Sequence, residues 1–164
     1  SKPRIHCVPW PHYRQPPDLV VRKLGAFGLG LYAAPELAAG VGARATPRAL
    51  AALPWVGHLG FADQAMLLRR GKHRETLRAQ ASLWGSDVLA VVRMAEQGAG
   101  GAVLPHWLAR PRVVAGRLDV LLPTWQLPNA QVWLAWRNRG SNRQAVALVA
   151  QHLRSRLMAR LRDG

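Results

Sequence analysis

The stretch QGAGGAVLPHWLA, residues 97–109, decides the fold predicted for this chain. Apolar residues recur at helical spacing before it, which predicts a helix over residues 88–97. The glycines interrupt that pattern, and the apolar run that follows predicts a strand over residues 102–104, closed by Pro105. Residues 106–108 then predict a helical turn. A helix, a tight turn and a strand in this order are typical of an α/β domain.

The three glycines at positions 98, 100 and 101 suit this interpretation. One of them can end the helix in a left-handed conformation, which costs glycine little because it has no Cβ. We expect the other two to allow a tight turn and close packing of the helix on the strand. Ser86 and Asp87, directly after a predicted strand, suit the start of the helix because their side-chain oxygens accept bonds from free backbone N–H groups.

Strands and helices alternate through the rest of the chain, with short connections between them. This order predicts an α/β fold with a largely parallel sheet. Two crossings rich in proline and tryptophan, near residues 9–18 and 123–129, suggest two lobes. The predicted strands cover residues 4–8, 19–21, 27–35, 54–58, 77–84, 119–122 and 132–136; the other predicted helices cover 48–52, 62–72 and 142–161, and residues 36–45 are expected to be irregular.

Composition narrows the class of protein. The chain has 164 residues, of which 49% are hydrophobic, and no run long enough to predict a membrane span. One cysteine excludes an internal disulfide framework, which suits a cytoplasmic protein. The net charge of +15 raises the possibility of binding to nucleic acid. Arginine far outnumbers lysine, however, so the bias of a GC-rich genome accounts for most of this charge as a solvated surface.

The sequence holds no strong motif for catalysis, a metal or a cofactor. Glycines 25, 28 and 30 lie inside a predicted strand, so we interpret them as packing glycines rather than a dinucleotide loop. The six histidines form no metal-binding frame, and Ser86 lacks a hydrolase elbow. The basic terminal helix, with Val146, Val149 and Leu153 on one stripe, is expected to dock on the sheet. We therefore predict no enzyme, no metal and no cofactor.

One pattern points to a binding site. Ser86 and Pro105-His106 both follow strands that should end at the same edge of a parallel sheet, and His58 follows another. Free N–H groups at a helix start and the positive charge of the chain favour a small anion there, such as a carboxylate. Tryptophans, Trp84 among them, are expected to line the walls.

The ordered set of segments resembles the effector-binding domain of LysR-type transcriptional regulators. The segments that carry the resemblance are PPDLVVRKLGAFGLGLYAAPEL (16–37), TPRALAALPWVG (46–57), SDVLAVVRMAEQGAGGAVLPHWLA (86–109), GRLDVLLPTW (116–125) and VWLAWRN (132–138). The resemblance implies two Rossmann-like lobes of the type II periplasmic-binding-protein class, with the first lobe incomplete here. It divides the chain into residues 1–25 (a remnant of lobe I and the first crossing), 26–124 (lobe II) and 125–164 (the second crossing and the return to lobe I with the terminal helix).

The resemblance also implies function. It implies that a small, anionic effector binds in the cleft between the lobes and that DNA is bound by an N-terminal domain outside this chain. It further implies a homo-oligomer, a dimer or a tetramer, in the cytoplasm and not at a membrane. The effector-binding residues, expected from the resemblance and from the strand ends, are Val8, Trp10, Lys23, His58, Leu59, Phe61, Trp84, Gly85, Ser86, Pro105, His106 and Val132.

Two alternatives stay open at this stage. A solute-binding protein of the same fold would need export from the cytoplasm. A basic nucleic-acid-binding domain would bind DNA through this chain alone, with a steep dependence on salt.

Overall fold

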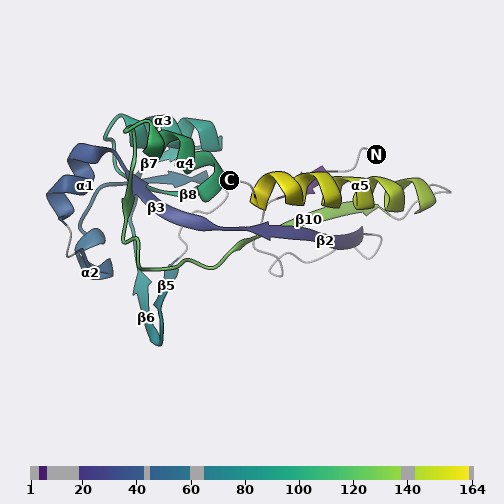
Figure 1. The fold of residues 1–164 in the computed structure, drawn as a ribbon, viewed down its shortest axis with the longest axis horizontal. Coiled ribbons are helices and arrows are strands. Elements are labelled where there is room, and N and C mark those ends of the chain that lie inside the picture. The colour runs from purple at the N-terminus through teal and green to yellow at the C-terminus, as the bar shows by residue number, and fades with distance from the viewer. Residues whose placement is uncertain (1–3, 7–18, 43–44, 60–64, 138–142, 163–164) are drawn as a thin grey trace. The chain divides into compact units, whose positions relative to one another are not determined.

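The computed structural model describes residues 4–6, 19–42, 45–59, 65–137 and 143–162 (Figure 1). The chain divides into two compact units. One unit is the continuous segment 28–128, and the other combines residues 1–27 with residues 129–164. The boundaries between them lie at Gly28 and Pro128, next to the ends of long strands.

A five-stranded sheet forms the centre of the segment 28–128. Its strand order is β7 (Ala81–Gly85), β4 (Trp55–His58), β8 (Gly101–Pro105), β3 (Leu29–Ala33) and β9 (Asp119–Leu121). Strand β4 pairs in parallel with both β7 and β8, whereas β3 pairs antiparallel with both β8 and β9. The prediction of a largely parallel sheet is therefore correct for β7, β4 and β8 but wrong for β3, which enters from the other unit rather than through a helical crossover.

Helices cover this sheet, and both of its faces carry a hydrophobic core. The helices are α1 (Pro35–Val41), α2 (Pro47–Leu50), α3 (Val88–Glu96) and α4 (His106–Val114). Neighbouring residues of β3 belong to different cores: Tyr32 packs with Val91 and Val92 of α3, while Leu31 packs with Trp55. Successive side chains of a strand point to opposite faces, so β3 contributes to a core on each side of the sheet, and helices lie against the sheet in Figure 1.

Trp55 anchors the second of these cores. Its side chain is 2% exposed, and its indole N–H donates a hydrogen bond of 2.8 Å to the carbonyl of Leu50 at the end of α2. Thr46 caps the same helix by accepting a bond from the N–H of Ala49, and Pro47 stands at its first position, as the sequence predicts.

The glycines of the opening stretch are explained in part as predicted. Gly98, which follows the C-cap residue Gln97 of α3, has a φ of +75°, the left-handed conformation expected at the end of the helix. Gly100 and Gly101 were predicted to allow close packing of the helix on the strand, and this packing partner was wrong. A Cβ at Gly100 would lie 2.7 Å from the carbonyl oxygen of Pro54, and one at Gly101 would lie 3.2 Å from the ring of Trp55. These glycines therefore bring β8 close to the start of β4, rather than the helix close to the strand.

Two further elements differ from the prediction. Residues 62–72 were expected to be helical, but β5 (Met66–Arg70) and β6 (His73–Leu77) form an antiparallel hairpin. The strand predicted over 77–84 is consequently divided, with β6 ending at Leu77 and β7 beginning at Ala81. Residues 36–45 were expected to be irregular, yet α1 begins at Pro35 and ends before Gly42, whose φ is +76°.

The described residues of the second unit form a three-stranded antiparallel sheet and one helix. The strand order is β1 (Arg4–His6), β10 (Ala130–Arg137) and β2 (Leu19–Phe27), and the helix α5 (Arg143–Arg162) packs against β2. Its core consists of Leu24, Val132 and Leu134, with Ala150 and Leu153 of α5 packed against them. Val149 is 48% exposed, so it does not belong to the packed stripe to which the helical spacing assigned it.

Candidate functional site

Three parallel strands of the five-stranded sheet end at the same edge. Because β7, β4 and β8 run in one direction, their carboxyl ends at Gly85, His58 and Pro105 share that edge, and His58 lies directly beside Gly85. Ligands of open α/β sheets bind outside the carboxyl ends of strands. The structure thus brings together His58, Trp84, Gly85, Ser86, Pro105 and His106 from the predicted site, and we call this place the strand-end edge.

Trp84 gives the strand-end edge an aromatic wall. Its ring lies over Gly57 of β4, where any Cβ would collide with the ring atoms. The side chain nevertheless stays 38% exposed. An aromatic ring fixed by a neighbouring glycine and open on one side can contact the apolar part of a small molecule.

The start of α3 places backbone N–H groups at the strand-end edge, because α3 begins shortly after the end of β7. Asp87 caps the helix, since its Oδ1 accepts a bond of 2.5 Å from the N–H of Leu89. Gly85 is buried, and a Cβ there would lie 3.0 Å from Val91, so the glycine keeps the first turn of α3 close to β7. Ser86 stands exposed between the strand and the cap. The partial positive charge of the helix start favours an anion beside Ser86, while the carboxylate of Asp87 limits the room on its own side.

His106 is held against β3 at this edge. Its Nδ1 lies 2.7 Å from the hydroxyl of Tyr32, and its backbone N–H donates to the carbonyl of Gly28. A Cβ at Gly28 would lie 2.5 Å from the imidazole, and one at Gly30 would lie 2.9 Å from it. The two glycines therefore make room for the histidine, which confirms their interpretation as packing residues. The partner Tyr32 was not predicted from the sequence.

Burial shifts both titratable groups of this pair. Desolvation lowers the pKa of His106 from its ordinary value of 6.5 and raises the pKa of the Tyr32 hydroxyl. The lowered pKa favours the neutral form of the imidazole, which acts as a hydrogen-bonding group toward Tyr32.

The remaining predicted site residues are placed differently. Leu59 follows β4 and is 57% exposed. Lys23 and Val132 belong to the other unit, where Lys23 is exposed on β2 and Val132 is 2% exposed inside the core. A side chain buried to that extent has little surface to offer a ligand. Val8, Trp10 and Phe61 lie outside the described residues.

Lys23 lines a groove of about 570 Å³ between β2 and α5. Arg22 and Arg154 add two further positive charges to its rim, and its apolar lining includes Leu24 and Trp136. The groove lies wholly within the unit of residues 1–27 and 129–164. It is thus a separate feature from the strand-end edge, and its placement beside Lys23 was not predicted.

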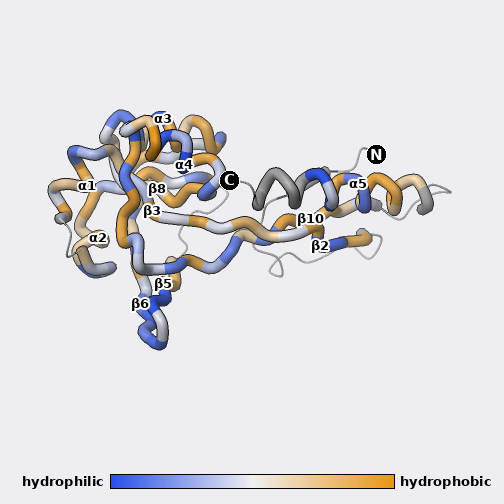
Figure 2. Tube along the Cα trace, in the orientation of Figure 1, coloured by the Kyte–Doolittle hydropathy of each residue, from blue (hydrophilic) through white to orange (hydrophobic). Residues whose placement is uncertain are grey.

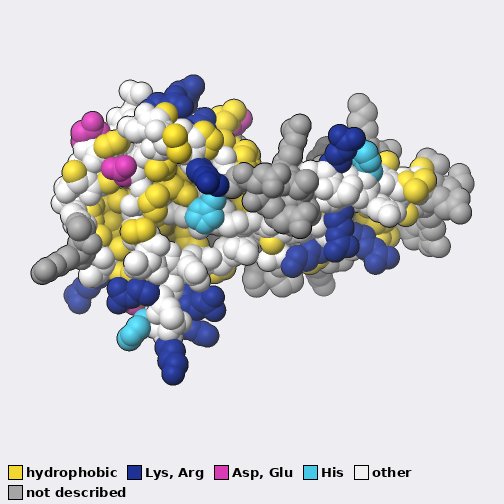
Figure 3. Space-filling view, viewed as in Figure 1, with side chains coloured by type: hydrophobic (Ala, Val, Ile, Leu, Met, Phe, Trp, Pro, Cys, Tyr) yellow, Lys and Arg dark blue, Asp and Glu magenta, His cyan; other side chains and the backbone are white. Residues whose placement is uncertain are grey.

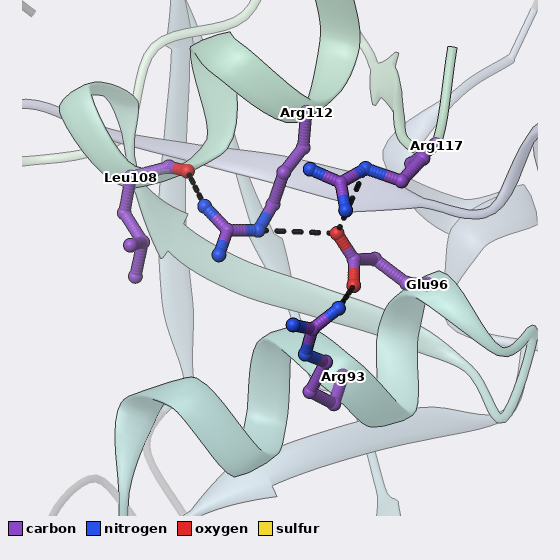
Figure 4. Close-up of polar contacts among 5 residues, drawn as sticks. All are labelled: Arg93, Glu96, Leu108, Arg112 and Arg117. Atoms are coloured by element: carbon purple, nitrogen blue, oxygen red, sulfur yellow. Dashed lines mark hydrogen bonds and ion pairs between the residues drawn. The ribbon is translucent and has the colours of Figure 1, made fainter. Parts of the chain in front are cut away.

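An ion cluster lies at the other end of α3. The side chain of Glu96 is only 4% exposed and is surrounded by three arginines (Figure 4). Arg93 lies 3.0 Å, Arg112 3.1 Å and Arg117 3.6 Å from its carboxylate oxygens, and Arg112 also donates to the carbonyl of Leu108. The contact between Arg112 Nε and Glu96 Oε1 is close but poorly aligned as a hydrogen bond. This cluster joins α3, α4 and the turn before β9, so it is a structural element of the lobe.

Within the described residues, no cluster of histidine, cysteine, aspartate and glutamate could hold a metal ion. No helix in the described part of the chain is both long and apolar enough to cross a bilayer.

Comparison with known proteins decides what this fold is. The model of the LysR substrate binding domain matches residues 7–158, nearly the whole chain. The chain belongs to the LysR substrate-binding domain family. This confirms the resemblance of the ordered segments, and the mixed α/β fold is that of the periplasmic-binding-protein-like regulatory domains.

Two relatives of this LysR-family domain are transcriptional regulators. The chain is 32% identical over 127 residues to the HTH-type transcriptional regulator PtxR of Pseudomonas aeruginosa, covering 77% of this chain and 40% of that protein. It is 29% identical over 126 residues to a probable HTH-type transcriptional regulator, SinR, of Salmonella typhimurium, covering 74% of this chain and 40% of that protein. The chain thus spans about two fifths of the length of these relatives.

Solved structures share the fold at low sequence identity. The regulatory domain of CrgA from Neisseria meningitidis gives a TM-score of 0.70 at 15% identity, over 93% of this chain and 74% of that chain. The effector domain of AmpR from Pseudomonas aeruginosa gives 0.63 at 16% identity, over 98% of this chain and 73% of that chain. At this identity the likeness concerns the fold alone.

Proposed function

We propose that this LysR-family domain is the effector-sensing part of a DNA-binding transcriptional regulator, and that it binds a small organic anion at the strand-end edge. The observation that carries the proposal is the convergence of three parallel strand ends with the start of α3 beside Ser86. A sensor of this kind works by binding its effector more tightly in one conformation than in another. The regulator would act in the cytoplasm as a homo-oligomer, would bind DNA through a domain outside this chain, and would not catalyse a reaction.

The chemistry of the edge narrows the effector. The helix start supplies N–H donors for a carboxylate, and the exposed part of Trp84 supplies a surface for an apolar or aromatic group. His106, whose lowered pKa favours the neutral imidazole, adds a hydrogen-bonding group. We therefore propose a small carboxylic acid with an apolar body. The parts that Lys23, Val132, Val8, Trp10, Leu59 and Phe61 play in binding it stay predictions.

Isothermal titration against a panel of small aliphatic and aromatic carboxylates tests this proposal. The variant Ser86→Asp is expected to bind the acid at least about tenfold more weakly than the wild type, because its new carboxylate repels the nearby carboxylate of the acid. The same new charge also suits a helix start, so the fold should be kept. The matched control is Ser82→Asp, which places an equal charge at the amino end of β7, on an exposed residue.

Two results would reject the proposal. One is an absence of binding across the whole panel. The other is an equal loss of affinity in Ser86→Asp and Ser82→Asp, which would show that binding responds to net charge and not to the strand-end edge.

A further inference from the structure

The hairpin β5–β6 carries a concentration of positive charge that the proposed function does not use. Residues 66–78 include five arginines and lysines against a single glutamate, a net charge of +4. Lys and Arg side chains gather around the tip of the hairpin, and the tip is its most hydrophilic part (Figures 2 and 3). The basic residues are Arg69, Arg70, Lys72, Arg74 and Arg78, and all of them are exposed.

The hairpin is firmly attached to its lobe. Leu68 and Leu77, near its base, are each 1% exposed in the core around Trp55. The backbone of Arg69 exchanges two hydrogen bonds, of 2.9 and 2.8 Å, with that of Gln126. The guanidinium of Arg70 stacks at 4.8 Å over the ring of Trp125. Because these contacts fix the strands, the charges are held in place before any partner arrives, which lowers the entropic cost of binding.

The arrangement of the charges on the hairpin is unfavourable, since the guanidinium of Arg69 donates to the neutral amide oxygen of Gln126 at 3.3 Å and gains no opposite charge from that contact. The register places Arg69 directly opposite Arg74 on the outer face of the hairpin. Like charges in such a cross-strand pair destabilise a sheet. Lys72 stands exposed in the turn two residues before Arg74, so a third cation follows closely along the hairpin. An anionic partner with regularly spaced charges would relieve this repulsion.

We propose that Arg69 and Arg74 on this outer face of the β5–β6 hairpin, together with Lys72 of its turn, contact the phosphate backbone of duplex DNA. A guanidinium binds phosphate through two parallel N–H groups, and a two-stranded ribbon has the width that a DNA groove admits. Among the described residues of the hairpin, Leu67 is the one large apolar side chain on this outer face. Protein–protein interfaces usually have an apolar or aromatic centre, so the face suits a polyanion better than a protein partner. The choice of DNA over another polyanion rests on the proposed function, in which the whole regulator is bound to DNA.

Fluorescence anisotropy with a labelled duplex of about 20 base pairs tests this contact on the chain as it stands. Binding is measured between about 50 and 200 mM salt for the wild type and for the triple variant Arg69→Gln, Lys72→Gln, Arg74→Gln. Each phosphate contact contributes about 0.9 to the slope of log affinity against log salt. The triple variant is expected to lower that slope by about 2 to 3 and the low-salt affinity by at least about tenfold. Glutamine removes the charge and also the cross-strand repulsion, so the hairpin should fold.

The control variant removes the same number of charges elsewhere, with Arg110→Gln, Arg154→Gln and Arg156→Gln, all on exposed helical positions. It is expected to change the slope by less than about 1. Three outcomes would overturn the proposal: no binding of the wild type at the lowest salt, equal losses in the two variants, or equally tight binding of polyglutamate, which would point to an acidic protein instead. The effector titration with Ser86→Asp is independent of this measurement, so failure of the hairpin contact leaves that result intact.

Discussion

At the scale of single residues, the partial desolvation of His106 beside Tyr32 makes stability depend on pH. Burial lowers the pKa of His106 below 6.5 in the folded state, while the unfolded chain keeps the ordinary value. In the pH range between the two values, the unfolded chain binds more protons, so the free energy of unfolding rises with pH. The stability that neutral His106 contributes is fully present above about pH 6.5 and is lost as the pH falls through the lower folded value.

Thermal unfolding of the wild type and of His106→Gln between about pH 8 and pH 5 checks this prediction. The melting temperature of the wild type is expected to fall more over this range than that of His106→Gln, which has no titrating group at this position. The other histidines are common to both proteins, and so they cancel in the comparison. Parallel curves for the two proteins would show that titration of His106 does not contribute to the pH dependence of stability.

The residue scale also shows how far the sequence predicts the candidate site. Gly85, Ser86 and Pro105 could be placed at strand ends from the sequence because each stands at the end of a predicted strand, alternating in polarity before Gly85 and Ser86 and apolar before Pro105. The pairing of His106 with Tyr32 could not be found in this way, since the two are 74 positions apart and meet only because β3 pairs with β8. For the same reason, nothing in the sequence near Lys23 indicated the groove beside α5.

At the scale of elements, the ion cluster around Glu96 holds α3, α4 and the turn before β9 together. Glu96→Gln keeps the shape of the side chain but leaves Arg112, which is 17% exposed, beside a neutral group. The expected cost is about 1–3 kcal/mol in the free energy of unfolding, measured with urea. This loss in the free energy of unfolding is smaller than the loss expected on breaking a fully buried ion pair, because the side chains of Arg93 and Arg117 are 68% and 50% exposed.

Arg93→Gln is the matched control for this cluster. It removes an exposed partner and leaves Arg112 and Arg117 on the carboxylate, so it should cost less than about 0.5 kcal/mol. If Glu96→Gln and Arg93→Gln lose the same amount of stability, the cluster stabilises the protein no more than an exposed ion pair does. It would then not be what holds α3, α4 and the turn before β9 together.

The elements that the sequence mispredicted have physical explanations. Residues 66–70, MLLRR, are good helix formers, so local propensity favoured a helix over 62–72. Burial of Leu68 and Leu77 against Trp55 outweighed that preference, and Gly71, with a φ of +59°, supplied the two-residue turn. Gly71 followed by the polar Lys72 is a sequence pattern typical of a hairpin turn. In the same way, Pro35-Glu36 at the start and Gly42 after the end are patterns typical of a helix such as α1.

At the scale of the whole molecule, the alternation of elements and the ordered family segments were enough to predict the fold class. The orientation of β3 was not predictable from that alternation, because it depends on where the chain enters the sheet and not on the sequence of β3 itself. A chain that leaves one unit and returns to it forms the other unit from one uninterrupted segment, here residues 28–128.

The division into two units predicts that residues 28–128 fold without the rest of the chain. As far as the described residues show, both hydrophobic cores of the five-stranded sheet and the ion cluster of Glu96 consist of residues from this segment. A segment with its own core and its own ion pairs meets the conditions for an independent domain. We expect the fragment 28–128 to unfold in a single cooperative transition, followed by tryptophan fluorescence in urea, with a core reported by the buried Trp55. A gradual, non-cooperative change in fluorescence would show instead that the segment needs residues 1–27 or 129–164 to hold its sheet together.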